Sequence, residues 1–161
     1  MNFKSVLAVV AVLSLMTGCA MSEQQPKVSP TQLADAKHLT QRSEVQLVDL
    51  LPEEDVSGVE QLSEGTVLRC GDGFQWSGRI RATLSDGVNA DTAQEQIAEA
   101  ATSRGDVVSE DRVSTGGRRY SIRTKDEVVL LVTVWDNGTM VNITSASPCF
   151  RLPDNSKRPR S

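Results

Sequence analysis

The sequence predicts an α+β fold of two layers, in which an antiparallel sheet carries helices on one face and one disulfide ties the domain together. Apolar residues recur first at helical and then at alternating spacing, in the order helix, two strands, helix, four strands. Glycine-containing dipeptides separate several of the strands, and connections this short join antiparallel neighbours. The third observation is a pair of distant cysteines, Cys70 and Cys149.

The first helix is expected over residues 30–51. Ser29 can cap its free amides, Pro30 suits its first turn, and Gln32 can reach back toward the capping residue. The side expected to face the core is apolar at roughly helical spacing and consists of Leu33, Ala36, Leu39, Leu47 and Leu50 or Leu51. Polar and charged residues are expected mostly elsewhere, namely Lys37, Gln41, Arg42 and Glu44.

An acidic run and two strands come next. Residues 53–55 are interpreted as solvated surface and residues 56–58 as a linker. A strand over residues 66–70 and a hairpin turn at Gly71-Asp72-Gly73 lead into a second strand over residues 74–84. Alternation in this second strand places Phe74, Trp76, Ile80, Ala82 and Leu84 inside, and Gln75, Ser77, Arg79, Arg81 and Thr83 outside.

The second helix is expected over residues 89–104, where the apolar period returns to that of a helix. Asp91 and Gln94 have the spacing of a capping box, and Gly105 is a stop signal. The apolar side of this helix consists of Ala93, Ile97, Ala100 and Ala101. Such small side chains allow the helix to lie close against the sheet.

Four strands complete the domain, over residues 107–115, 118–124, 128–135 and 139–147. Gly116-Gly117 and Asn137-Gly138 have two-residue hairpin spacing, and Lys125-Asp126 is expected to make the remaining turn. Residues 128–134 are apolar on both faces of their strand. This pattern predicts a central strand that a helix covers on one side.

The amino-terminal segment has the three-part layout of a signal peptide. Lys4 supplies a charge near the start, residues 6–16 form an apolar run, and Thr17-Gly18-Cys19 ends it. The apolar run has 11 residues, whereas about 20 are needed to cross the hydrocarbon core as a helix. We therefore expect a cleaved leader and no permanent span.

At Cys19 the chain resembles the bacterial lipoproteins, whose leaders end in Leu, a small residue, Gly or Ala, and then Cys. Thr17, Gly18 and Cys19 match this pattern, whereas Met16 stands at the leucine position. The resemblance implies cleavage before Cys19, a diacylglyceryl group on its sulfur, and an acylated amino terminus. Two or three acyl chains attach a protein stably to a membrane, which one chain does not. The alternative is an unlipidated secreted protein cut near Ala20.

These features divide the chain into a signal peptide (residues 1–18), a flexible tether (19–28), one α+β domain (29–152) and a disordered tail (153–161). The layout, with Cys70 after the first strand and Ser147-Pro148-Cys149-Phe150 near the end, also resembles small lipoproteins of the actinobacterial cell envelope. That resemblance implies a location on the extracytoplasmic face of the cell membrane. It supplies no functional residues.

The cysteines and the charge limit the possible partners. With Cys19 assigned to lipid, Cys70 and Cys149 remain as a pair in an oxidising compartment, which predicts a disulfide. A metal site is disfavoured because two distant cysteines lack further ligands at finger-like spacing, and no cofactor is expected. The formal net charge of -4 argues against nucleic acid and against general adhesion to anionic lipid.

Two sets of residues are candidates for binding. A basic site for an anionic wall polymer or sugar would use Arg79 and Arg81 from one strand, and Arg118, Arg119 and Arg123 from another. Outer-face arginines more commonly serve solubility and ion pairing. Trp76 and Trp135 could flank a groove for a carbohydrate or peptide, but core packing is the stronger interpretation because Trp76 shares the apolar phase of its strand.

Taken together, the sequence predicts a non-enzymatic envelope module that binds or accompanies a protein or wall-polymer partner near the membrane. His38, the only histidine, has no Cys, Ser or acidic partner at a recognisable spacing and is expected to face solvent. One alternative is a small hydrolase that acts through scattered carboxylates such as Glu53, Asp72 or Asp86. The other alternative is a purely structural envelope protein.

Overall fold

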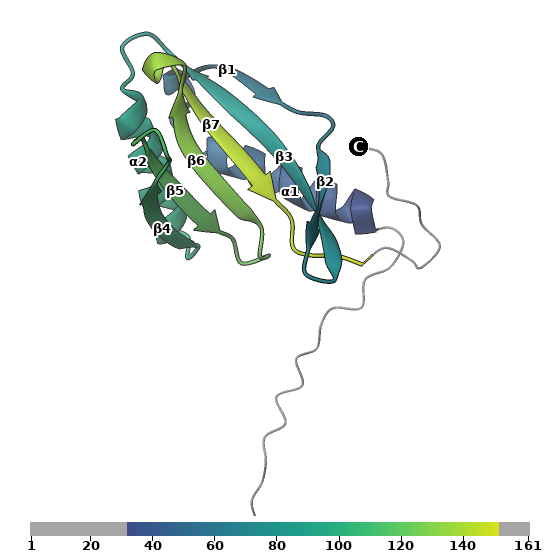
Figure 1. The fold of residues 1–161 in the computed structure, drawn as a ribbon. Helices are drawn as coiled ribbons and strands as arrows, with labels where there is room; N and C mark the ends of the chain where they lie inside the picture. The colour runs from purple at the N-terminus through teal and green to yellow at the C-terminus, as the bar shows by residue number, and fades with distance from the viewer. Residues whose placement is uncertain (1–31, 152–161) are drawn as a thin grey trace, which may run out of the picture.

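Both helices lie on one face of a seven-stranded antiparallel sheet, which confirms the predicted two-layer α+β arrangement (Figure 1). The structure is a computed structural model that describes residues 32–151. Within this range the elements are α1 (Gln32–Val48), β1 (Val56–Gln61), β2 (Thr66–Cys70), β3 (Gly73–Leu84), α2 (Ala90–Ser103), β4 (Val107–Arg112), β5 (Arg118–Arg123), β6 (Val129–Trp135) and β7 (Met140–Ala146). Short 3-10 turns precede β1 and β7, namely η1 (Glu53–Asp55) and η2 (Asp136–Gly138).

The long strand β3 organises the sheet. The strand order is β1-β3-β7-β6-β5-β4, and β2 pairs with β3 outside this path. β2 pairs with the first part of β3 and β1 with its second part, so the two short strands lie end to end along one edge of β3. β7 occupies the other edge. The chain after β7 continues beside β3 through two backbone hydrogen bonds of 2.7 Å between Phe74 and Phe150.

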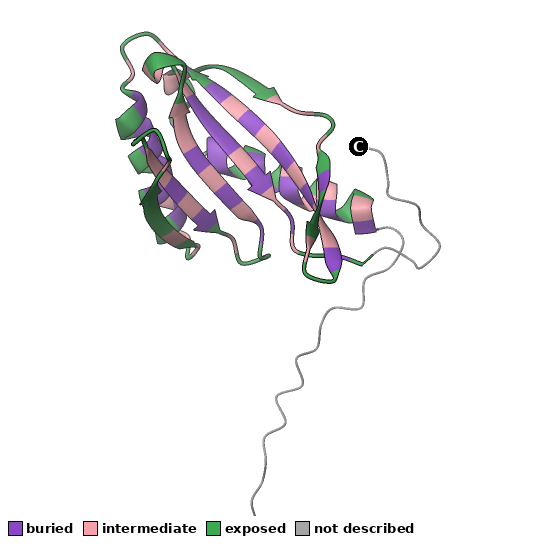
Figure 2. Ribbon diagram, in the orientation of Figure 1, coloured by how far each residue is buried: buried purple, intermediate pink, exposed green. Residues whose placement is uncertain are grey.

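The core lies between the sheet and the two helices. α1 packs over β3 and β7, and α2 packs over β4, β5, β6 and β7. The predicted alternation of β3 is confirmed, because Trp76, Ile80, Ala82 and Leu84 are all buried. Figure 2 shows the resulting bands of buried and half-buried residues along the strands. In α2 the buried side chains include Ala93, Ala98 and Ala101, which is consistent with a close approach of helix and sheet.

The linker expected at residues 56–58 is wrong, because these residues begin the edge strand β1. Four consecutive residues of β1 are exposed, so it has no alternation of apolar and polar side chains. Its pairing with β3 is made by the backbone, with an irregularity between Val56 and Gly58. An exposed edge strand held by main-chain hydrogen bonds leaves no periodic signal in the sequence.

The carboxyl end of α1 and its buried side also differ from expectation. α1 ends at Val48, and the chain then turns through Leu50 and Leu51, whose backbone amides bond to the carbonyls of Leu47 and Val48. Leu47 and Leu51 are buried as predicted. Glu44, which was expected on the polar side, is fully buried at the interface with the sheet.

The amino end of α2 uses a different cap from the predicted one. The side chain of Asn89 accepts a hydrogen bond of 2.9 Å from the backbone amide of Thr92. Gln94 is buried instead of capping the helix, and its Nε2 donates to the backbone carbonyls of Arg118 (3.0 Å) and Val132 (2.8 Å). A side chain that serves a neighbouring strand cannot also close a capping box.

The prediction of a central strand is confirmed. β6 lies between β7 and β5, and Leu130 and Val132 on its helix side are fully buried. The connection from β6 to β7 is the 3-10 turn η2 and not a two-residue hairpin. Asp136 and Asn137 both have φ of 52°, a left-handed conformation that Asn and Asp tolerate better than other side chains.

Candidate binding face

The face of the sheet opposite α1 and α2 is the candidate functional surface, and we call it the open face. Figure 1 shows it from the front at β3, β7 and β6, with α1 behind these strands and α2 at the left edge beside β4 and β5. Because side chains alternate along a strand, the residues between the buried ones project onto this face. On the four interior strands they are Gln75, Ser77, Arg79, Arg81 and Thr83 of β3; Met140, Asn142, Thr144 and Ala146 of β7; Val129, Leu131, Thr133 and Trp135 of β6; and Arg119, Ser121 and Arg123 of β5.

Charge is distributed unevenly over the open face. Its four interior strands contribute four arginines and no carboxylate. Acidic side chains enter at the edge strands, where Glu60 of β1 pairs with Arg81 and Asp111 of β4 pairs with Arg119. In a chain with a formal net charge of -4, positive charge is therefore concentrated at the centre of this face, which favours ligands of negative charge.

A row of polar side chains crosses the open face from one edge to the other. The strand register places one residue from each of six strands side by side, in the order Glu60, Arg81, Asn142, Thr133, Arg119 and Asp111. Within the row, Asn142 Nδ2 donates to Thr133 Oγ1 at 3.5 Å, and an Arg81 guanidinium nitrogen lies 3.8 Å from the Glu60 carboxylate. The row is a continuous line of hydrogen-bonding groups on a rigid backbone.

The two arginines of β5 on this face already have counterions. Arg119 makes two hydrogen bonds of 2.8 and 2.5 Å to the carboxylate of Asp111. The hydrogen bond from Arg119 lowers the pKa of the Asp111 carboxyl and raises the pKa of the Arg119 guanidinium. Arg123 lies 3.1 Å from the carboxylate of Glu127 in the following turn. Both arginines are therefore less available to an incoming anion.

Arg81 reaches across β7 to the ring of Trp135. Its guanidinium carbon lies 5.3 Å from the ring centroid, within the range of a cation–π contact. Asn142 is paired with Arg81 and with Thr133, one row away from the Met140 and Trp135 pair, and it is only 1% exposed although no helix covers it. Arg81 Nε and Asn142 Oδ1 are both buried without a hydrogen-bond partner among the described residues. Trp135 itself is 44% exposed.

Arg79 is the remaining arginine of the four. It lies two residues before Arg81 on the same face of β3 and opposite Thr144 of β7. Its side chain is half-buried, and within residues 32–151 no carboxylate lies within ion-pair distance of its guanidinium. Arg79 and Arg81 therefore form a pair of cations with one weak counterion, the exposed Glu60 carboxylate.

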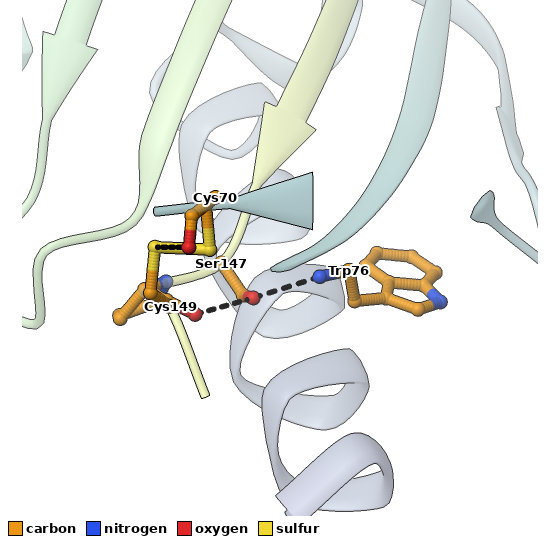
Figure 3. Close-up of a disulfide and its surroundings, with 5 residues drawn as sticks. Cys70, Trp76, Ser147 and Cys149 are labelled. Carbon is orange, nitrogen blue, oxygen red and sulfur yellow. Dashed lines mark hydrogen bonds between the residues drawn. A yellow bond between two sulfur atoms is a disulfide. The ribbon is translucent and has the colours of Figure 1, made fainter. Parts of the chain in front are cut away.

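One end of the open face is hollowed beside the predicted disulfide. A cavity of about 560 Å³ is lined by Gln75, Val129 and Arg123 of the open face and by the segment from Ser147 to Arg151. Cys70 and Cys149 are joined at its rim, which confirms the predicted disulfide (Figure 3). Beside the bridge, Ser147 Oγ accepts from the backbone amide of Trp76 at 3.0 Å and donates to the carbonyl of Pro148 at 2.8 Å.

The two tryptophans lie on opposite sides of the sheet and do not flank one groove. Trp76 is 3% exposed and packs with Ala36, Val67 and Phe150 beneath α1, so the core interpretation holds for it. It is wrong for Trp135, which lies on the open face. Arg118 likewise differs from its neighbours, because it projects to the helix side, where it lies 3.9 Å from Glu95 of α2.

The three carboxylates of the hydrolase hypothesis do not share one site, because Asp72 lies far from the other two. Asp72 precedes β3 and Asp86 follows it, so they are separated by the length of a 12-residue strand, or about 40 Å. Glu53 lies in η1, near the end of β3 that Asp86 follows, because the Ser85 amide donates to the Asp55 carbonyl. His38 is exposed on α1, as predicted.

Sequence reasoning missed two side chains that the structure makes prominent. Asn142 is one, because its place between Arg81 and Thr133 depends on the pairing of β3, β7 and β6. Glu44 is the other, and lies on the helix side of the sheet. Its carboxylate accepts hydrogen bonds from Ser145 Oγ and, at 2.6 Å, from Gln61 Nε2, while burial raises its pKa. In the sequence, the only signal of Glu44 is that a charged residue interrupts the apolar side of the first helix.

Cys19, the signal peptide, the tether and the tail lie outside the described residues, so the anchoring predictions stay predictions. Neither helix within residues 32–151 is long and apolar enough to span a membrane. The same residues contain no group of three or more His, Cys, Asp or Glu side chains placed to hold a metal ion. Comparisons with protein-family models, curated proteins and solved structures found no match.

Proposed function

We propose that this protein is a lipid-anchored module of the bacterial cell envelope that acts by binding a partner through its open face and that catalyses no reaction. The observation that carries this proposal is the uncovered face of the sheet, with four arginines and no carboxylate on its interior strands. A charged, largely polar surface of this kind is suited to a ligand that arrives from solvent.

The rigidity of the surface supports a binding role. Each interior strand is hydrogen-bonded on both sides, and the helix side is filled by fully buried residues such as Ile80, Leu130 and Ile143. Side chains on such a scaffold keep their relative positions, so less conformational entropy is lost when a ligand binds. The carboxylates Asp72 and Asp86, by contrast, lie at opposite ends of β3, so these two do not act on one bond.

The position of Cys19 in the chain supports the anchoring part of the proposal. Twelve residues lie between Cys19 and the first described residue of α1, Gln32, so 13 residue steps join the two. A chain of this length spans at most about 45 Å when fully extended. The lipid would therefore keep the open face within a few nanometres of the membrane, where an envelope protein or a wall polymer is available.

A photo-crosslinking experiment in intact cells tests the proposal. Benzoylphenylalanine is placed at Ser121 on the open face or at Glu99, an exposed position on α2 that serves as the matched control. We expect a crosslinked adduct from Ser121 and none from Glu99. Adducts of equal yield from both positions, or none from either, would contradict binding through the open face.

The anchor is tested separately by the intact mass of the protein from the membrane fraction. We expect a chain that begins at Cys19 with added acyl groups, and we expect Cys19→Ser to release the protein from the membrane. A soluble, unacylated product of the unaltered gene would contradict the lipid anchor and leave the open-face proposal to the crosslinking result.

A further inference from the structure

We infer that Arg79, Arg81 and Trp135 form a subsite for an acidic sugar unit of an anionic glycan. This inference rests on the proposed function, because it takes the open face as the binding surface and specifies the chemistry of the ligand. The required ligand features are a carboxylate or phosphate group for the arginines and a sugar ring for the indole.

The first step of the argument is the availability of cations. Arg119 and Arg123 are paired at 2.5 to 3.1 Å with carboxylates of the chain itself. Arg79 has no such partner among residues 32–151, and the contact of Arg81 with Glu60 is longer, at 3.8 Å to a side chain that is 70% exposed. An external anion therefore gains the most electrostatic binding energy at the pair formed by Arg79 and Arg81.

The second step is geometry. Residues two apart on a strand project from the same face at about 7 Å spacing. Two guanidinium groups at this spacing present planar forks of N–H donors, which match the oxygen pairs of carboxylates and phosphates. Thr144, directly opposite Arg79, supplies a hydroxyl group on the neighbouring strand. The anionic group thus lies beside a further hydrogen-bonding partner.

The third step is the exposed indole. Trp135 offers a flat apolar surface beside Arg81, whose guanidinium carbon lies 5.3 Å from the ring centroid, and it is 44% exposed. Aromatic rings combine this apolar surface with a polar edge and so suit ligands with one apolar face and many hydroxyl groups. A free inorganic anion would make no use of the indole, whereas a sugar ring with an acidic substituent would contact the indole and the arginines together.

The fourth step concerns the polar atoms without partners. Arg81 Nε and Asn142 Oδ1 are buried and have no hydrogen-bond partner within residues 32–151, and such atoms are few in native proteins. An anion that draws the Arg81 guanidinium toward Arg79 would uncover the ring of Trp135 and the amide of Asn142. The amide oxygen could then accept a hydrogen bond from a sugar hydroxyl. Binding would therefore change the environment of Trp135, the more exposed of the two tryptophans in the chain.

The test is a fluorescence titration of the folded, disulfide-bonded protein. The probes are an oligogalacturonate, a sugar-phosphate polymer, a neutral maltooligosaccharide of matched length, and phosphatidylglycerol vesicles. We expect at least one of the two acidic glycans to change the tryptophan emission and the maltooligosaccharide to have no effect. The arms with the two acidic glycans distinguish carboxylate from phosphate as the recognised group.

Variants locate the site. Arg79→Ala should weaken binding of the acidic glycan about tenfold or more, because it removes a charged hydrogen-bonding partner. Trp135→Phe should abolish most of the emission change. Arg42→Ala, which removes an exposed arginine of α1, is the matched control for loss of one positive charge and should leave the affinity unchanged. Circular dichroism of each variant confirms that it is folded.

Three outcomes would overturn the inference. They are equal losses in Arg79→Ala and Arg42→Ala, binding of the vesicles alone, and failure of both acidic glycans at millimolar concentration. If the Ser121 crosslink still captures a partner in cells while both glycans fail, the ligand class is wrong and the open face remains the binding surface. If the crosslink fails as well, the proposed function fails with it.

Discussion

Asn142 and Ile143 are consecutive residues of β7 that are equally buried on opposite faces of the same sheet. Ile143 lies in the apolar core beneath the helices, whereas Asn142 is covered only by its neighbours on the open face. If burial alone decided the role of a residue, Asn142 and Ile143 would have the same role. One face of this sheet therefore contributes the apolar core, while the other positions polar groups, and we expect the removal of such a polar group to cost the fold less.

The largest effect is expected from a substitution on the helix side of the sheet, which we call the covered face. Ile143→Ala should lower the free energy of unfolding by about 2–5 kcal/mol, because it removes buried methyl groups and leaves a cavity. Asn142→Ala should cost no more than about 1 kcal/mol, since one of its polar atoms already lacks a partner. Denaturant unfolding of both variants measures the difference, and equal losses would contradict the distinction between the faces.

The disulfide is the next test, because it fastens the segment that runs beside β3. Cys70→Ser with Cys149→Ser should lower the free energy of unfolding by about 2–5 kcal/mol. Hydrogen exchange should then rise first around Trp76 and Phe150, which share the smaller apolar cluster next to the bridge. If hydrogen exchange accelerates equally in all strands, the bridge instead stabilises the protein by restricting the unfolded chain as a whole.

Glu44 gives the covered face a pH dependence. Burial raises its pKa above the ordinary value of 4.5, so the folded state holds its proton at pH values where the unfolded chain has released it. The stabilising contribution is complete below pH 4.5 and is lost as the pH rises through the raised pKa. Glu44→Gln should flatten this dependence and increase stability at neutral pH. If the Glu44→Gln variant keeps the same dependence of stability on pH, then another titratable group causes that dependence.

The smallest effect is expected at the edge of the open face. Arg119 and Asp111 form a well-aligned ion pair, but both side chains are accessible to solvent and to salt. Arg119→Ala should shift the thermal midpoint only slightly, and the shift should vanish at about 1 M salt, where the screening length is near 3 Å. A double-mutant cycle with Asp111→Ala measures the pair directly. A large, salt-independent coupling would show that the open face also supports the fold.

The covered face could be predicted from the sequence because it depends on local periodicity. Alternation identified the buried residues of β3, and the apolar run of β6 identified a central strand. The open-face row could not be predicted, because Arg81, Asn142 and Thr133 become neighbours only through the order β3-β7-β6, which no local pattern encodes. Glu44 and β1 were missed for related reasons. A buried acid depends on partners from β1 and β7, and an exposed edge strand depends on the backbone of β3.

If the domain is anchored at its amino end, as we propose, the disulfide has a mechanical consequence. Tension applied through α1 would reach Cys70 after β1 and β2, and at that cysteine it would divide between two covalent routes. One route enters β3 directly, and the other crosses the bridge to Cys149 and enters β7 from its far end. β3 and β7 are paired along seven residue positions at the centre of the sheet. A load on the tether would therefore pull on both strands at once, and the arginine-bearing surface between them would keep its shape while the amino-terminal elements yield.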